Sequence, residues 1–74
     1  MNLSDAKKCG IYKIIQIHLP GAVQRRLQML GMTDGTKCAV LNKKNNGPMI
    51  IKVRGTRFAL GRGFCRGITV EEVQ

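Results

Sequence analysis

The chain has 74 residues, and a chain of this size buries only about 60–65% of the surface that its unfolded form exposes, so a deep active-site cleft is not expected. Apolar residues make up 43% of the chain, too many for a disordered protein, and predict one small folded domain over residues 1–74. Thirteen Lys and Arg against four Asp and Glu give a net charge of +9, which favours an anionic partner: nucleic acid, an acidic protein face or an anionic membrane surface.

The first predicted strand covers residues 11–17 and follows a short lead-in, residues 3–10, that turns at Gly10. Its many β-branched residues favour a strand, but the alternation of apolar and polar residues is imperfect. Ile11, Lys13, Ile15 and Ile17 fall on one side, and Tyr12, Ile14 and Gln16 fall on the other. The pattern predicts a strand that is covered on part of both faces.

One helix is predicted between Pro20 and Gly31, since Val23, Leu27 and Leu30 recur at the i, i+4, i+7 spacing of an apolar stripe. Proline suits the helix start, and Gly31 suits the left-handed position after the last turn, where a β-carbon would clash. On the helix surface Arg25 and Gln28 lie opposite the stripe, Arg26 lies on its flank and Met29 points toward solvent.

Two further strands, residues 36–41 and 49–54, are predicted to form an antiparallel hairpin. A polar loop over residues 43–48, with Asn46-Gly47 at its tip, joins them. Alternation in the first of these strands places Cys38 and Val40 on one face and Lys37 and Ala39 on the other.

A corner follows in the stretch "VRGTRFALG", residues 53–61, where Gly55-Thr56 predicts a two-residue type II′ turn with positive φ at Gly55. A strand over residues 57–60 comes after it. Arg54 and Arg57 are expected to project from the outer face. The inside is expected to be filled by Val53, Phe58 and Leu60.

The segment "GRGFCRG", residues 61–67, is too glycine-rich for a stable helix and lacks the Lys-Ser or Lys-Thr of a phosphate-binding loop. It predicts a flexible turn with two solvated arginines, before a closing strand over residues 68–73. Five short strands, one helix and glycine-bearing corners predict a mainly β fold, a small, partly closed, five-stranded barrel of the SH3-like kind.

Chemistry at the residue level is sparse. Asp5, Asp34, Glu71 and Glu72 are scattered, His18 stands alone, and no pairing for acid–base catalysis is indicated, so we predict no enzymatic activity and no catalytic residues. Cys9, Cys38 and Cys65 show neither a disulfide framework nor zinc-ligand spacing and predict small apolar fillers in a reducing compartment. We assign no metal or cofactor site.

The absence of long apolar segments in the sequence bears on where the protein is located. With no run of 18 apolar residues and no apolar leader, the sequence predicts a cytoplasmic chain without membrane insertion.

A basic nucleic-acid-binding module is the alternative function. The bases of a bound nucleic acid would need aromatic side chains on which to stack, and the rings of the chain are Tyr12, Phe58 and Phe64. Packing inside the barrel is the simpler expectation for these rings, so nucleic acid is the less favoured partner.

Three stretches of the chain resemble the ferrous iron transport protein A (FeoA) family, in order and at suitable separations. They are "RLQMLGMTDGT" (residues 26–36), "PMIIKVRGTRFAL" (residues 48–60) and "ITVE" (residues 68–71). The resemblance implies an SH3-like barrel without catalytic activity that acts as an accessory partner of the membrane ferrous iron transporter, ferrous iron transport protein B (FeoB), which has a cytoplasmic GTPase domain. Asp34, where proline is common, the segment 61–67 and the high net charge depart from the family pattern.

We combine these patterns into one hypothesis for partner binding. A methionine left exposed and surrounded by cations suits a protein contact. The predicted partner-facing surface therefore joins the helix face to the arginines of the corner, and its residues are Arg25, Arg26, Gln28, Met29, Arg54 and Arg57.

Overall fold

The computed structural model describes residues 1–45 and 47–73, so Asn46 of the predicted loop tip lies outside the described residues. The predicted helix and all five predicted strands are present, close to the predicted bounds, and two short helical turns are added. In chain order the elements are η1 (Leu3–Asp5), β1 (Ile11–Ile17), α1 (Gly21–Met29), β2 (Lys37–Lys43), β3 (Met49–Val53), β4 (Thr56–Leu60), α2 (Arg62–Cys65) and β5 (Ile68–Glu72).

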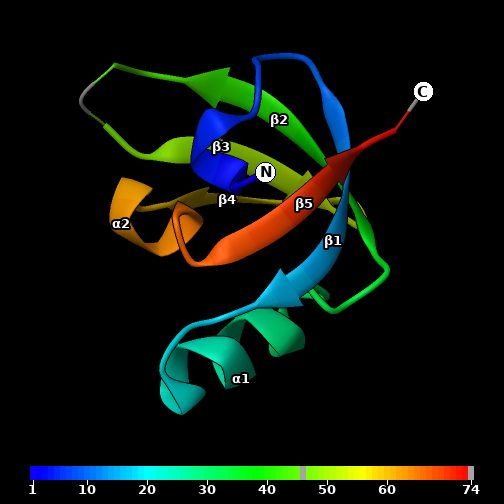
Figure 1. Ribbon diagram of the computed structural model, residues 1–74, viewed down its shortest axis with the longest axis vertical. Coiled ribbons are helices and arrows are strands. Elements are labelled where there is room, and N and C mark those ends of the chain that lie inside the picture. The colour runs from blue at the N-terminus through cyan, green and yellow to red at the C-terminus, as the bar shows by residue number, and fades with distance from the viewer. Residues whose placement is uncertain (46, 74) are drawn as a thin grey trace.

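These strands form one antiparallel sheet in the order β4-β3-β2-β1-β5. The sheet curls into a barrel that is not closed between β4 and β5, and α2 links these two strands at the opening (Figure 1). Asn2 forms a bridge with Thr69, so the N-terminal segment covers the outer edge of β5. The partly closed five-stranded barrel predicted from the sequence is therefore confirmed, and within the described part of the chain no strand covers the outer edge of β4.

A bulge in β1 accounts for its irregular sequence pattern. The register with β5 shifts between Ile14 and Gln16, and an extra residue turns the following side chains over. Tyr12, Ile14 and Ile17 are consequently buried, whereas Ile11 and Ile15 are exposed. The prediction of a strand covered on both faces is wrong, because the irregularity comes from the bulge.

The end of α1 follows the prediction. Gly31 has a φ of 95°, its N–H donates to the Gln28 carbonyl over 3.0 Å, and the Met32 N–H donates to the Leu27 carbonyl over 2.9 Å. These two bonds are the Schellman arrangement, in which a glycine satisfies the last carbonyls of a helix. Met32 is fully buried and therefore fixes the chain to the core directly after the helix.

The corner between β3 and β4 lies one residue earlier than predicted. Val53 pairs with Thr56, so Arg54 and Gly55 are the central residues, with φ values of 50° and 83°. Positive φ at both residues fits a type I′ turn, not the predicted type II′ turn. An L-residue in the left-handed region costs roughly 1–2 kcal/mol, and this is why the sequence pointed to glycine as the first turn residue.

The glycine-rich segment after β4 also differs from its prediction. Residues 62–65 form the single helical turn α2, in which the N–H groups of Phe64 and Cys65 donate to the Gly61 carbonyl over 3.0 and 3.1 Å. Arg62 is half-buried, and its Nη2 donates to the Lys44 carbonyl, whereas Arg66 is solvated as predicted. Burial of Cys65 offsets the low helix propensity of the glycines, which the sequence alone did not reveal.

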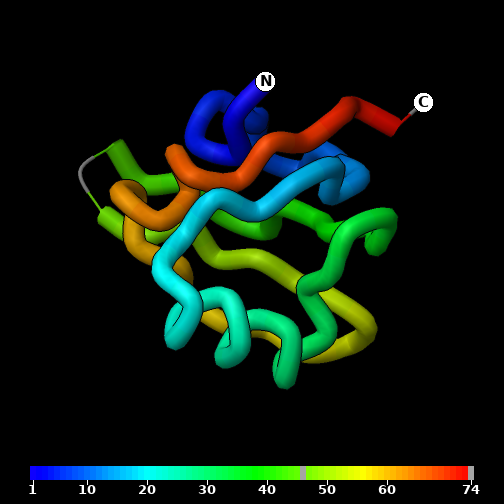
Figure 2. Tube along the Cα trace, turned by 60° about the horizontal axis from the view of Figure 1, so that its bottom comes forward, coloured from blue at the N-terminus to red at the C-terminus, as the bar shows by residue number. Residues whose placement is uncertain are grey.

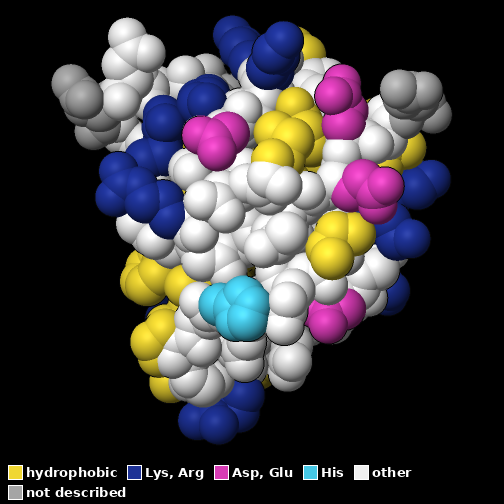
Figure 3. Space-filling view, viewed as in Figure 1, with side chains coloured by type: hydrophobic (Ala, Val, Ile, Leu, Met, Phe, Trp, Pro, Cys, Tyr) yellow, Lys and Arg dark blue, Asp and Glu magenta, His cyan; other side chains and the backbone are white. Residues whose placement is uncertain are grey.

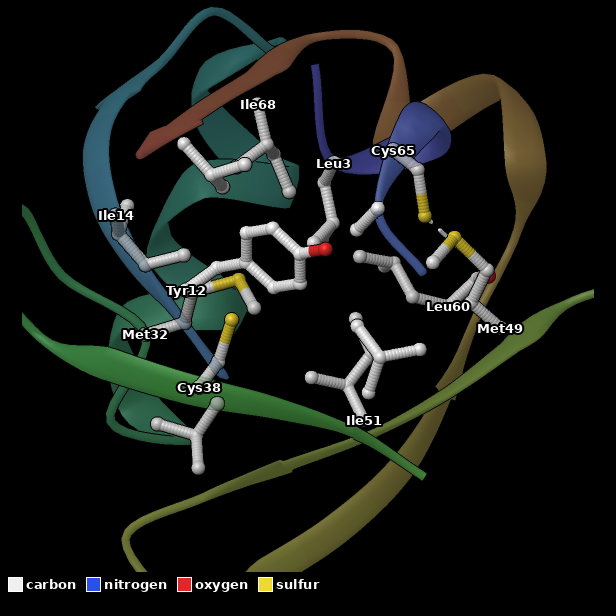
Figure 4. Close-up of a cluster of buried hydrophobic side chains, with 14 of the residues drawn as sticks. Leu3, Tyr12, Ile14, Met32, Cys38, Met49, Ile51, Leu60, Cys65 and Ile68 are labelled. Atoms are coloured by element: carbon white, nitrogen blue, oxygen red, sulfur yellow. Dashed lines mark hydrogen bonds between the residues drawn. The ribbon is translucent and has the colours of Figure 1, made fainter. Parts of the chain in front are cut away.

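Tyr12 lies at the centre of the core (Figure 4). Its hydroxyl accepts the Lys7 N–H over 2.8 Å, so the buried phenol is hydrogen-bonded. A β-carbon at Gly10 would lie 2.6 Å from the Tyr12 ring, so this glycine makes room for the tyrosine. The lead-in turns next to Gly10, where the sequence predicted a turn, and the residue with positive φ is Cys9, at 70°.

The three cysteines divide into two environments. Cys38 and Cys65 are buried, as predicted, whereas Cys9 is exposed, so its assignment as an apolar filler is wrong. Burial, with a smaller effect of the nearby Cys65, raises the pKa of Cys38 to about 11. Burial also raises the pKa of Cys65 to about 11, although Arg62 and Lys43 act in the opposite direction.

Candidate functional site

An apolar groove of about 430 Å³ lies between α1 and the segment that runs from β4 into α2. This volume falls within the ~300–1,000 Å³ typical of ligand pockets. Figure 2 shows α1 lying alongside the β3–β4 hairpin. The residues that line the groove are Ala22, Val23, Arg26, Leu27, Leu30, Phe58, Ala59, Leu60, Gly61 and Phe64.

The groove stays open because α1 is anchored by few residues. Leu27 is the buried residue of α1, while Val23 and Phe58 pack against the core only in part. Phe64 on the opposite wall is 43% exposed. Figure 3 shows hydrophobic side chains along the lower left edge of the molecule, between the positions of α2 and α1. The groove therefore presents apolar side chains that the barrel itself does not cover.

One wall of the groove is a strand edge. Four consecutive residues, 58–61, line it, and β4 is the terminal strand of the described sheet. In a two-residue hairpin the closing pair, here Val53 and Thr56, is hydrogen-bonded, and the bonded pairs then alternate along the ladder. The N–H and C=O groups of Arg57 and Ala59 consequently point away from β3. The groove combines main-chain hydrogen-bonding groups with apolar side chains, as sites for β-strand addition do.

The charge at the groove is positive. Arg26 is the charged residue among those that line it, and no carboxylate of the described residues is among them. An apolar segment that also carries Asp or Glu would therefore be complementary in both shape and charge.

The predicted partner-facing residues fall into separate places. Arg26 lines the groove, and Met29, three residues later, is 87% exposed on the neighbouring helix surface, as predicted. Arg54 extends over the end of α1, with its Cδ 3.1 Å from where a β-carbon of Gly31 would lie. Arg57 lies on the outer face of the sheet, opposite Lys52, and Gln28 points about 160° away from Arg26 around the helix. Of the two arginines of the corner, Arg54 is thus the one that lies against the end of α1.

The apolar walls of the groove were not predicted from the sequence. Val23, Leu30 and Phe58 were assigned to the interior, and Phe64 was placed in a flexible turn. Val23, Leu30 and Phe58 belong to apolar patterns that a fully buried face would also produce, so the sequence held no signal that these faces stay uncovered.

Residues 1–45 and 47–73 contain neither a cluster of metal ligands nor a helix that could span a membrane. Within these residues no group of three His, Cys, Asp or Glu lies close enough to hold a metal ion. In the same part of the chain, no helix has the length and apolar character needed to cross a membrane.

Known proteins match this chain in sequence. The family model described as the FeoA domain matches residues 1–72. A curated protein of Methanocaldococcus jannaschii is named as a candidate Fe(2+) transport protein A. It is 41% identical to this chain over 54 residues, which cover 73% of this chain. The match spans 63% of that relative's own length.

Two solved structures share the fold. The FeoA protein of Chlorobium tepidum is 31% identical with a TM-score of 0.94, and the match covers 100% of this chain and 71% of that one. The FeoA of Stenotrophomonas maltophilia, complexed with zinc and described as a prokaryotic SH3 domain protein, is 26% identical with a TM-score of 0.80. That match covers 96% of this chain and 89% of the other, and it confirms the predicted SH3-like fold.

Proposed function

This chain belongs to the FeoA domain family, whose members are linked to ferrous iron transport, and on that premise we propose that it is an accessory protein of a ferrous iron transporter. In this proposal it works in the cytoplasm, performs no catalysis itself, and binds the cytoplasmic GTPase region of the membrane transporter FeoB. Binding regulates the transporter.

The observation that carries the proposal is the uncovered apolar groove beside α1. A small barrel that functioned alone would gain stability by burying Phe64, yet this ring stays 43% exposed on the groove wall. Met29 adds an 87% exposed apolar side chain next to Arg26 on the rim. Apolar surface bordered by cations is the composition of a protein contact site.

The groove also suggests the chemistry of the bound segment. The free edge of β4 offers main-chain groups to an extended chain, and Arg26 favours a segment with acidic residues. We infer that FeoB supplies a short apolar segment with flanking Asp or Glu to this groove.

The nucleic-acid alternative receives no support from the rings. Tyr12 is buried in the core, and Phe58 and Phe64 line the groove, so stacked bases would have to enter an apolar cleft with a single cation in its lining.

A charge substitution on the rim tests the proposal. Met29→Glu should weaken binding to the purified GTPase region about tenfold or more, because it adds a charge to a contact that loses its water. Gln28→Glu is the matched control: it makes the same kind of substitution on the far side of α1 and should leave the affinity unchanged. Binding is measured by calorimetry with the GTPase region in its GTP-bound and GDP-bound states.

A bulky residue in the groove gives a second test. Ala22 is exposed and lines the groove, so Ala22→Trp fills part of it without disturbing the core, while Gln28→Trp serves as the control. Equal affinities for Ala22→Trp, Met29→Glu and both controls would remove the groove from the proposal. Absence of binding by the unaltered chain in both nucleotide states would overturn the partner itself.

A further inference from the structure

The outer face of the sheet carries cations in directly opposed pairs. Lys13 of β1 stands opposite Lys37 of β2, and Lys52 of β3 stands opposite Arg57 of β4. Ala39, two residues after Lys37, pairs with Lys52, so the two pairs are diagonal neighbours on the same face. All four side chains are exposed. We call these four residues, Lys13, Lys37, Lys52 and Arg57, the cationic strand face.

This arrangement works against stability. Like charges directly opposite each other in an antiparallel ladder are destabilising. In the described strand registers, one carboxylate lies opposite a residue of this face: Glu71 of β5 is paired with Lys13. Figure 3 shows the Asp and Glu side chains as separate groups spread over the side of the molecule on which β5 lies in front. Lys37, Lys52 and Arg57 therefore have no carboxylate opposite them in the described strand registers.

The cationic strand face is distinct from the groove. None of its four residues lines the groove, and the proposed contact with the transporter uses Arg26 and Met29 instead. Partner binding at the groove leaves both opposed pairs unexplained, along with most of the net charge of +9. An anionic surface placed against this face would remove the repulsion between the paired cations.

We propose that the cationic strand face binds the anionic surface of a lipid bilayer, which would hold the protein beside the membrane without inserting it. Two exposed isoleucines support a bilayer: Ile11, 50% exposed, pairs with Ala39 on this face, and Ile15 of the same strand is 41% exposed. Cations interspersed with exposed aliphatic side chains suit the boundary of headgroups and acyl chains.

Nucleic acid would supply phosphates too, but the cationic strand face offers nothing on which bases could stack. The ring of Tyr12 is buried, and those of Phe58 and Phe64 lie at the groove. The side chains of the four paired residues are aliphatic stems that end in cationic groups. These features favour lipid over nucleic acid as the anionic ligand.

The test measures co-sedimentation with vesicles made of equal parts phosphatidylglycerol and phosphatidylcholine, and with vesicles of phosphatidylcholine alone. The unaltered chain should bind the anionic vesicles only, and less strongly as salt is raised above about 0.1 M. Since each Lys or Arg near an anionic surface strengthens binding about fivefold, Lys37→Glu with Lys52→Glu should weaken it about 25-fold or more.

The control carries the same change in net charge at another place. Arg25→Glu with Arg66→Glu alters exposed arginines of α1 and of the residue after α2, and should retain most of the vesicle binding. The Lys37→Glu, Lys52→Glu chain is expected to fold at least as stably as the unaltered one, because both like-charge pairs become opposite-charge pairs. A thermal melt of both variants verifies this, so lost binding cannot be attributed to unfolding.

Three results would overturn the proposal. The unaltered chain could fail to bind the anionic vesicles, or both double variants could lose binding equally, which would make net charge alone responsible. A random oligonucleotide could also bind more tightly than the vesicles, with the same dependence on Lys37 and Lys52, which would assign the face to nucleic acid. Because only lipid, oligonucleotide and this chain are present, none of these results depends on whether the groove binds a transporter.

Discussion

Apolar side chains have different roles on the two sides of the barrel. On the closed side, where β1 lies between β2 and β5, side chains such as Ile14 and Ile68 are fully buried. On the open side, beside the free edge of β4, Phe58 is only partly buried and Phe64 is 43% exposed. The closed side supplies folding stability, and the open side retains apolar surface for a partner. A barrel with one uncovered strand edge can thus separate stability from binding.

The largest expected difference between the two sides comes from deleting apolar side chains. Ile14→Ala removes a fully buried residue of the closed side and should lower the free energy of unfolding by about 2–5 kcal/mol. Phe64→Ala removes a larger side chain from the open side, but should cost about 1 kcal/mol or less, because the ring is already partly in water. Urea titrations of both variants measure this. Equal losses would mean that the groove wall belongs to the core and would end the comparison.

Adding a methyl group at two glycines should give a smaller difference of the same kind. A β-carbon at Gly67 would lie 2.5 Å from the His18 carbonyl oxygen, so Gly67→Ala should destabilise the fold by about 1–3 kcal/mol. Gly63, in α2, has no atom within 4 Å of its β-carbon position, so Gly63→Ala should be neutral or stabilising by about 0.5–1 kcal/mol. Thermal melts in which Gly67→Ala is the more stable variant would show that the packing around His18 is looser than described.

The thiols give the smallest expected effect, and it depends on pH. Burial raises the folded-state pKa values of Cys38 and Cys65 from 9.0 to about 11, so between these values the unfolded chain loses protons that the folded chain retains. The contribution of the two protonated thiols to the free energy of unfolding is therefore fully present below pH 9 and is lost as the pH rises toward 11. By about pH 10 each thiol should have lowered the free energy of unfolding by about 1 kcal/mol.

Urea titrations across this pH range measure the thiol effect, with a Cys38→Ala, Cys65→Ala chain as the reference in which this part of the pH dependence should disappear. Cys9 offers an internal comparison, because it is exposed and should react with iodoacetamide in the folded protein while the two buried thiols do not. An unchanged pH dependence in the double variant would show that the two buried thiols do not cause it.

Local sequence determined most of the secondary structure and the kind of fold. The spacing of Val23, Leu27 and Leu30 with a following glycine predicted α1, because a helix end needs a residue that tolerates positive φ at that place. Alternation predicted β2 and β3, and the resemblance to the FeoA family was confirmed by the match over residues 1–72.

Tertiary structure decided what the side chains of these elements do. The bulge in β1 buried Ile17 and exposed Ile15, and burial of Cys65 held a glycine-rich segment in a helical turn. The groove has the same origin: an apolar stripe in the sequence says that a face avoids water, but only the distance between α1 and β4 determines whether another part of the chain covers it. Opposed cations such as Lys52 and Arg57 likewise meet only through strand register, which links residues that the sequence separates by a turn.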